Sequence, residues 1–501
     1  MKKRLLFMSA LAVFTLAGCD NTAATTTTTS NEVVTTSKED EALKTENEAL
    51  KAENEKIKAE LEAAKKANGE LETSNNTLKD DKTKLESDVS NLETSVDSLT
   101  KENEKLLDEN KSIKQSIKSY LKYNNEYAVS FTNYLGNTES AYFKVNDYST
   151  VLEALSSFAD VNASTSDYGT YINSINNSFF DNNWAIMVYE NYESSAVGVD
   201  GLQIDAGDVF EFKHECWNTV ESGWGTFDEY DILVDQVIYH YAKDRFKTTL
   251  NDTTTWTGST YWEDMALYKL ITAESQYGGP LYDTNLFNTS LINADLKTAI
   301  SSKNVEELEG TDLFKFYYAA RLTDLDLTAF TTKYGAYVES FTEYGEWGEY
   351  TIPFVTSTAK TLGLIDKLSD NVKNTTYKPD ASQWGPDGIS WQLTGMASYK
   401  ELADTDLTEL SFDKLENSLS KDVSLSSMIL PYAASNKSVR SVKNSDGVDV
   451  IEYLFDNYFD ASTMKFTTEA SGTDFSSNQI YAALVAYKVQ RDTQKACNLF
   501  E

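Results

Sequence analysis

The sequence predicts a multidomain chain with a long coiled-coil helix, a small α+β domain and an all-α domain, and three observations support this division. Between about residues 40 and 120, apolar residues repeat every seven positions. Over residues 124–217, short alternating runs are separated by turns rich in Gly, Asn and Asp. From residue 225 to residue 501, apolar residues recur at helical spacing. We expect domains over residues 39–121, 124–217 and 225–501.

The first domain is predicted from a heptad repeat that never changes register. Every seventh residue from Leu43 to Tyr120 is Leu or Ile at ten of twelve positions, and Asn recurs four residues on, as at Asn47 and Asn54. Leu at d with Asn at a favours a parallel homodimer, because a buried Asn pairs with its mate only in the aligned pair. The alternative is an isolated, charged and solvated helix. In either case the segment is a rod of roughly 120 Å without site chemistry.

The N-terminus predicts export and lipid anchoring. Three basic residues at positions 2–4 precede an apolar run, residues 5–16, that is too short to span a membrane. The run ends in Leu16-Ala17-Gly18-Cys19, which resembles the bacterial lipobox. That resemblance implies a signal peptide over residues 1–18 and a Cys19 that carries a diacylglycerol and fatty acids such as palmitate. Residues 19–38 are then the acylated Cys and a flexible tether rich in Thr and Ser. An ordinary signal with a chance Cys is the alternative.

The composition argues against several partners and sites. The formal net charge is −35, from 79 acids against 44 bases, and such a surface repels nucleic acid. His214 and His240 are the two histidines, which leaves little material for a His-based metal or acid–base centre. Cys216 and Cys497 could pair, but two free thiols are the expected state. We predict no metal site, no cofactor and no nucleic-acid partner.

Residues 124–217 are expected to place one helix on a mixed sheet. Strands are predicted over residues 126–134, 141–145, 172–175, 184–189 and 209–212. Thr150 should cap a short helix over residues 151–158, and Gly207-Asp208 indicates a plain hairpin turn. In the all-α part, helices are predicted to start near Asp228, Tyr261, Ala294, Asp312, Thr328, Ile352, Asp387, Thr408, Asp446 and Ser477.

Five phrases in the α+β segment resemble one known domain. They are Ser149–Leu155, Tyr171–Asn176, Trp184 with Met187–Asn191, Gly198–Asp200 and Ala206–Phe212. In this order they resemble the β domain at the C-terminus of transcobalamin and intrinsic factor, which is also found in many bacterial surface proteins. The likeness spans about 90 residues.

The helical segment resembles the same protein class. Asp387–Met396 and Ser476–Tyr487 carry the likeness, and Asp324–Thr328 is echoed 80 residues on at Asp404–Thr408. A repeated helix–turn–helix unit predicts stacked hairpins around a common core. The phrases resemble the α/α toroid of the terpenoid-cyclase and prenyltransferase class, again nearest the transcobalamin–intrinsic factor branch. In this chain the β domain comes before the toroid, whereas in the vitamin carriers it follows.

The toroid enzymes depend on groups that this sequence lacks. Asp324-Leu325-Asp326 is superficially like the acidic run of triterpene cyclases, but its place between helices favours a helix-linking turn. Protein prenyltransferases need Asp, Cys and His around zinc, whereas His240 and Cys497 stand at opposite ends of the predicted toroid. The sequence has no Cys-Gly-Glu-Gln thioester run and no Ser-nucleophile elbow. We therefore predict that the protein is not an enzyme.

A binding role fits the toroid better, because a ring of helices leaves a cavity that a second domain can close. The candidate ligand-binding residues of the ring are Trp262, Asp312, Tyr350, Asp387, Trp391 and Ser476. Trp184 and Tyr192 are the candidates on the β domain. Each has a structural alternative, since the acid and the hydroxyl residues cap helices well and the aromatic residues suit a core.

These expectations combine into one hypothesis. The protein is a lipoprotein anchored at the extracytoplasmic face of a bacterial cell membrane, and a coiled coil raises a two-domain head that captures a small molecule. The resemblance makes a corrinoid the first ligand to consider. The alternative is an adhesin or cell-envelope spacer whose head binds protein or glycan.

Overall fold

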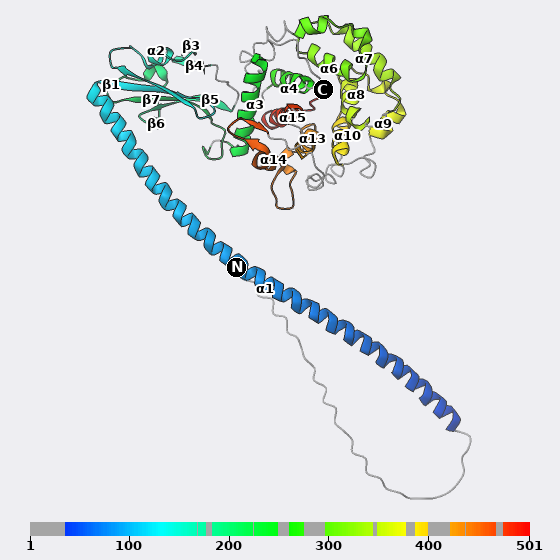
Figure 1. The fold of residues 1–501 in the computed structure, drawn as a ribbon. Helices are drawn as coiled ribbons and strands as arrows, with labels where there is room; N and C mark the ends of the chain where they lie inside the picture. Colours follow the sequence, from blue (N-terminus) through cyan, green and yellow to red (C-terminus); the bar gives the residue numbers. More distant parts are fainter. Residues whose placement is uncertain are drawn as a thin grey trace, which may run out of the picture. The chain divides into compact units, whose positions relative to one another are not determined.

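In a computed structural model the chain divides into two compact units, residues 1–110 and residues 111–501 (Figure 1). The structure describes residues 36–167, 169–176, 183–223, 225–248, 260–274, 296–343, 348–376, 386–398, 421–435, 437–466 and 474–501. The predicted signal peptide, Cys19 and the helix starts expected at Ala294 and Thr408 lie outside these residues. A multidomain chain with a long N-terminal helix, a small sheet domain and an all-helical region is confirmed.

The long helix α1 covers Thr36–Asn124, 89 residues, slightly more than predicted. Its heptad side chains are exposed along the whole length, with Leu71 67% and Leu99 64% accessible. Surface ion pairs such as Lys101–Asp97, at 2.7 Å, lie between them. A continuous apolar stripe therefore runs along a charged helix, and its pairing with a second helix stays a prediction.

The sheet domain contains a mixed five-stranded sheet in the order β2-β1-β7-β5-β6. Its strands are β1 Glu126–Thr132, β2 Thr138–Lys144, β5 Trp184–Glu190, β6 Glu193–Ser194 and β7 Val209–Cys216. β1 and β7 pair in parallel, and the other pairs are antiparallel. A separate hairpin joins β3 Val161–Ser166 to β4 Gly169–Ile175, and a single 3-10 turn, η1, covers Val199–Gly201.

Alternation along β1 and β7 builds the core of this domain. Tyr127, Val129 and Phe131 of β1 are buried with Phe210 and Phe212 of β7, because residues two apart point to the same face of a strand. The helix α2, Val151–Ser156, packs on that face. As predicted, Thr150 caps it: the Thr150 hydroxyl accepts the Glu153 N–H at 3.1 Å, and the Glu153 carboxylate returns the contact.

Gly207 is more than a residue of a plain hairpin turn. It adopts φ +102°, and its N–H donates to the Glu126 carbonyl at 2.8 Å. A Cβ there would lie 3.2 Å from the Lys118 carbonyl of α1. A side chain would therefore push the last turns of α1 away from the sheet, which is a reason for glycine that the turn pattern did not reveal.

The helical region contains two long helices and several shorter ones. They are α3 Glu229–Thr248, α4 Thr260–Thr272, α6 Gly310–Ala320, α7 Thr328–Ser340, α8 Ile352–Thr361, α9 Asp370–Thr376, α10 Pro386–Met396, α13 Lys421–Ala433, α14 Val450–Tyr458 and α15 Asp474–Thr493. Short 3-10 turns are η5 Val305–Glu307, η6 Gly348–Thr351, η7 Ile365–Lys367 and η8 Val439–Ser441, and a two-residue hairpin pairs β8 Phe459–Asp460 with β9 Lys465–Phe466.

The contacts between these helices run in a closed cycle (Figure 1). Going round it, α4 contacts α15, α15 contacts α13, α13 contacts α10, and α10 contacts α8. The cycle closes through α6: Phe314 stacks on Phe354 of α8 at 5.2 Å, and α6 in turn contacts α4. The helices of this cycle carry most of the largest apolar core.

The predicted boundaries differ from the structure where a side chain ends or starts an element. β1 stops at Thr132 instead of Tyr134, because the Asn133 carboxamide accepts the Leu135 N–H at 2.9 Å and turns the chain. α14 begins at Val450 rather than near Asp446, because the Asp449 carboxylate accepts the N–H groups of the first turn. α2 stops at Ser156, and β3, α9 and α13 are elements that the patterns did not predict.

Candidate functional site

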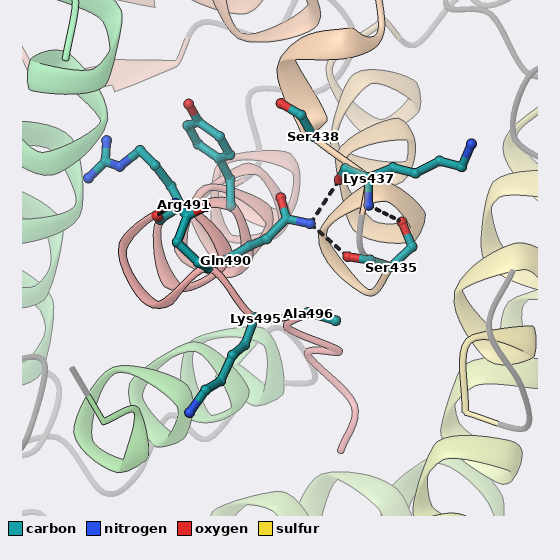
Figure 2. A pocket seen from close by; sticks show the side chains of 9 residues that line it. Ser435, Lys437, Ser438, Gln490, Arg491, Lys495 and Ala496 are labelled. Atoms are coloured by element: carbon teal, nitrogen blue, oxygen red, sulfur yellow. Dashed lines mark hydrogen bonds between the residues drawn. The ribbon is translucent and has the colours of Figure 1, made fainter. Parts of the chain in front are cut away.

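The described residues form a pocket of about 360 Å³ where the end of α15 meets the loop between α13 and η8 (Figure 2). Its walls are Ser435, Lys437, Ser438, Tyr487, Gln490, Arg491, Gln494, Lys495 and Ala496. On α15 the lining residues stand three and four positions apart, so one face of the helix forms the wall. The loop supplies the opposite wall.

Gln490 fixes the shape of this pocket. Its side-chain amide donates to the carbonyls of Tyr432 at 2.8 Å, Ser435 at 2.8 Å and Lys437 at 2.9 Å. The Ser435 hydroxyl then accepts the Lys437 N–H at 3.2 Å. The Gln490 amide thus contacts three carbonyls that would otherwise need water, and it holds the loop against α15.

The lining is basic in an acidic chain. Lys437, Arg491 and Lys495 line the pocket and no acid does, although the net charge of the chain is −35. Figure 2 shows Lys437 and Lys495 extending outward from its edge. The Lys495 ammonium is exposed and has no ion-pair partner in the part of the chain that the structure describes. The edge therefore offers positive charge to a solute.

Arg491, by contrast, is held by acids behind the pocket wall. Its guanidinium contacts Asp235 at 2.6 Å, Asp492 at 2.7 Å and Asp231 at 3.3 Å. Burial lowers the pKa of Arg491, but Asp235 and Asp492 reverse this effect, so its pKa stands well above its ordinary value. Arg491 is a fixed, permanently charged part of the wall and takes no part in proton transfer.

Lys488 completes the same charged cluster one turn earlier on α15. Its side chain is fully buried, and its ammonium lies 2.8 Å from Asp235 and 2.7 Å from Asp492. Burial raises the pKa of Asp492, but Arg491 and Lys488 outweigh it, and the net shift is downward. Asp492 stays ionised because both Arg491 and Lys488 pair with it.

This cluster also reaches the sheet domain. Asp235 accepts the indole N–H of Trp184, at the start of β5, at 2.9 Å. Nearby, the Gln236 side chain donates to the Tyr134 carbonyl at 2.7 Å. Tyr487, which lines the pocket, donates to Asp231 at 2.6 Å. One polar network thus joins the pocket wall, α3 and the sheet.

The eight predicted site residues occupy several different places, and none of the six whose side chains the structure describes lines the pocket. Trp184 is buried at the junction of β5 and α3, and Tyr192 packs near the end of α1, with the Lys114 ammonium 4.7 Å from its ring. The Asp312 side chain is 65% exposed and pairs with Lys315 at 3.7 Å. The side chains of Asp387 and Ser476 lie outside the described residues.

The other three predicted residues do come together. The ring centroid of Trp391 lies 5.6 Å from that of Trp262 and 5.7 Å from that of Tyr350. Phe500 fills the space between the two tryptophans, 5.8 Å from each. Three of the predicted rim residues therefore form an aromatic cluster with Phe500 of the same chain, and their binding of a ligand stays a prediction.

Comparison with known proteins identifies part of the sheet domain. Residues 149–215 match the family described as "Domain of unknown function (DUF4430)". A crystal structure of a "putative metal binding protein" from Ruminococcus gnavus ATCC 29149 matches 18% of this chain and 97% of its own, at 17% identity and a TM-score of 0.17. No curated protein matches the chain. The likeness to the transcobalamin β domain is compatible with these matches.

The DUF4430-like segment, α2 to β7, adds no metal cluster to the site. Across the described ranges, no three His, Cys, Asp or Glu residues are placed to hold a metal ion. Cys216 and Cys497 are not joined in a disulfide, and burial raises the pKa of Cys497 to about 11, so it stays protonated at neutral pH. In the same ranges, no helix has the length and apolar character needed to cross a membrane.

Proposed function

We propose that the protein is a lipid-anchored, non-catalytic binding protein of a bacterial cell surface, whose head captures a small anionic molecule in the pocket of Figure 2. The observation that carries this proposal is a basic pocket in a strongly acidic chain. Elsewhere the negative surface repels anions, so binding requires a local group of cations. Lys437 and Lys495 supply them at the edge.

The pocket favours a ligand of modest size. Its volume of about 360 Å³ lies near the lower end of the range typical of small-molecule sites. The Ser438 hydroxyl adds a neutral donor that can orient a carboxylate or phosphate, whereas the N–H groups of Gln490 are already used on backbone carbonyls. A corrinoid, suggested by the transcobalamin resemblance, is larger and would engage the pocket with only part of its structure.

The long helix would present this head away from the membrane. Cys19 acylation anchors the chain, and the exposed Leu stripe of α1 pairs with a second copy to form a parallel coiled coil. In this proposal the helical region is an α/α toroid, and the closed cycle of helix contacts supports it. No catalytic role is assigned, because the charged groups behind the pocket are fixed in ion pairs.

Equilibrium dialysis of the intact head tests the proposal with small dicarboxylates, sugar phosphates, cobalamin and cobinamide. We expect saturable binding of a small anion, and about tenfold weaker binding in the variant Lys437→Gln/Lys495→Gln, since one lost charge-assisted contact is worth roughly 1.4 kcal/mol or more. Lys367→Gln, on η7 and outside the pocket, is the matched control. Equal affinity in the wild type, the double variant and the control, or no binding of any ligand at high micromolar concentration, would contradict the proposal.

The second candidate, an adhesin or envelope spacer, rests on the outer edge of the sheet. Among the described residues β2 pairs with β1 alone, and its Tyr142 is 61% exposed; Tyr171 of β4 is 60% exposed. An open strand edge with exposed tyrosines suits a protein or glycan partner. If Tyr142→Ser abolished attachment of the purified head to host or envelope glycans and the pocket variant did not, adhesion would be the better account.

A further inference from the structure

Residues 497–501 lie at the centre of the helical cycle, where Figure 1 marks the end of the chain. α15 ends at Thr493, and Gln494 turns the chain with φ +56°. Three exposed residues, 494–496, line the pocket of Figure 2, and the next four, 497–500, are buried. The segment is neither helix nor strand. It enters between the helices and ends in a turn, in which the Glu501 N–H donates to the Asn498 carbonyl at 3.2 Å.

Contacts to this segment come from most helices of the cycle. The Cys497 N–H donates to the Ala433 carbonyl of α13 at 2.6 Å. The Asn498 carboxamide donates to the hydroxyls of Ser357 at 3.1 Å and Ser398 at 3.0 Å, next to α8 and α10. Both hydroxyl groups are buried, so they recognise the amide in a site without water competition.

Phe500 is the apolar anchor. Its ring lies 4.9 Å from Phe354 of α8, in addition to Trp262 and Trp391, and its side chain is fully buried. The Phe500 carbonyl accepts the Tyr318 hydroxyl of α6 at 3.0 Å. An aromatic residue in an aromatic pocket with a fixed backbone contact is the usual arrangement of a recognition hot spot.

Cations surround the acidic end of the segment. The Lys360 ammonium lies 2.9 Å from the Glu501 carboxylate, and the Arg321 guanidinium donates to the Glu501 carbonyl. Burial lowers the pKa of Lys269, and the nearby Glu501 carboxylate partly opposes this shift. Amide, aromatic ring and acid are thus each met by a matching group, and α8 contacts all three through Ser357, Phe354 and Lys360.

We propose that the centre of the helical region is a peptide-binding site whose ligand is a short segment with the pattern Asn-x-Phe-acid, and that residues 497–501 occupy it from within the same chain. This goes beyond the small-ligand pocket and does not depend on it. A peptide of the same chemistry from another protein would compete with residues 497–501 for the aromatic pocket. The exposed residues 494–496 form the tether that would let the segment leave.

A complementation experiment tests this. The chain is truncated after Ala496, and a fluorescent peptide with the sequence of residues 495–501, KACNLFE, is added. We expect saturable binding to the truncated protein, at least tenfold weaker binding of the peptide with Ala in place of Phe, and no binding to the intact chain. In a second variant, a protease site inserted at residues 494–496 of the full chain is cleaved after folding, and exchange with the labelled peptide is followed over a day.

Each result of these two experiments either supports the peptide-binding site or overturns it. Selective binding to the truncated protein, or exchange into the cleaved one, supports the site. The proposal is overturned if a truncated chain that keeps its helical circular dichroism binds neither peptide or binds both equally. It is also overturned if truncation unfolds the protein and the cleaved chain either unfolds or fails to exchange, since the segment is then an inseparable part of the core.

Discussion

α1 and α15 both depart from the rule that apolar residues are buried and charged residues are exposed. α1 exposes apolar side chains, and α15 buries charged ones. α1 exposes a stripe of leucines, each more than half accessible along much of its length, whereas α15 buries Lys488 completely and most of Arg491. Exposed apolar surface and buried charge are both costly unless a partner covers or pairs them. α15 has its partners on α3, within the same chain. Over the described residues 40–110 the stripe of α1 stays exposed, and a second copy of the helix is the partner we propose for it.

The largest expected effect follows from removing one acid of the α15 cluster. Asp235→Ala leaves Lys488 and Arg491 buried with one carboxylate fewer, and breaking a buried pair in this way costs about 3–5 kcal/mol. Denaturant unfolding of the two proteins measures the loss. Glu86→Ala, which breaks an exposed pair with Lys82 on α1, should cost about 0–1 kcal/mol. Similar losses at the two sites would contradict the contrast between the helices.

Alkaline pH should lower the free energy of unfolding through the buried thiol of Cys497. Burial raises the pKa of Cys497 to about 11, so the folded thiol keeps its proton where the unfolded thiol has lost it. Its contribution is fully present below pH about 8.5 and declines as the pH rises towards 11, by about 2–3 kcal/mol in total. Unfolding free energies at pH 8 and pH 11 should therefore differ less in Cys497→Ala than in the wild type. An unchanged difference would show that Cys497 is not the group involved.

A smaller effect tests whether the α15 cluster extends to the sheet. Trp184→Phe keeps an aromatic ring but removes the pyrrole half with the N–H that Asp235 accepts, and we expect a loss of at least about 1.5 kcal/mol in unfolding free energy. Trp217→Phe, at a position 40% exposed, is the control and should change stability by less than about 0.5 kcal/mol. A Trp184 variant as stable as the control would mean that the bond to Asp235 contributes nothing to the junction.

Local patterns were sufficient where an element is held by its own residues. The heptads gave α1, alternation gave β1, and the capping box at Thr150 and Glu153 placed α2. Helix α13 was not predicted, because its serine-rich sequence with Pro431 obscures the helical spacing of its apolar residues. Tertiary packing nevertheless buries much of this helix. Propensity is a weak guide where packing decides.

The candidate site was less accessible to sequence reasoning, because its groups are distant along the chain. Asp231 and Tyr487 are 256 residues apart, and no pattern predicts their hydrogen bond. Trp262, Tyr350 and Trp391 were predicted as a group from helix starts, but Phe500, which fills their centre, lay outside any motif. The polar face of α15 around Gln490 was the one visible signal for the pocket, since it interrupts an apolar, Ala-rich helix.

Sedimentation equilibrium of the soluble chain, without lipid, tests most directly whether α1 obtains its partner from a second copy. The account predicts a mass of twice that of the single soluble chain, and dissociation to single chains when Leu71 and Leu92 are both replaced by Asp in the exposed stripe. A wild-type protein that sediments as a single chain at micromolar concentration would contradict it.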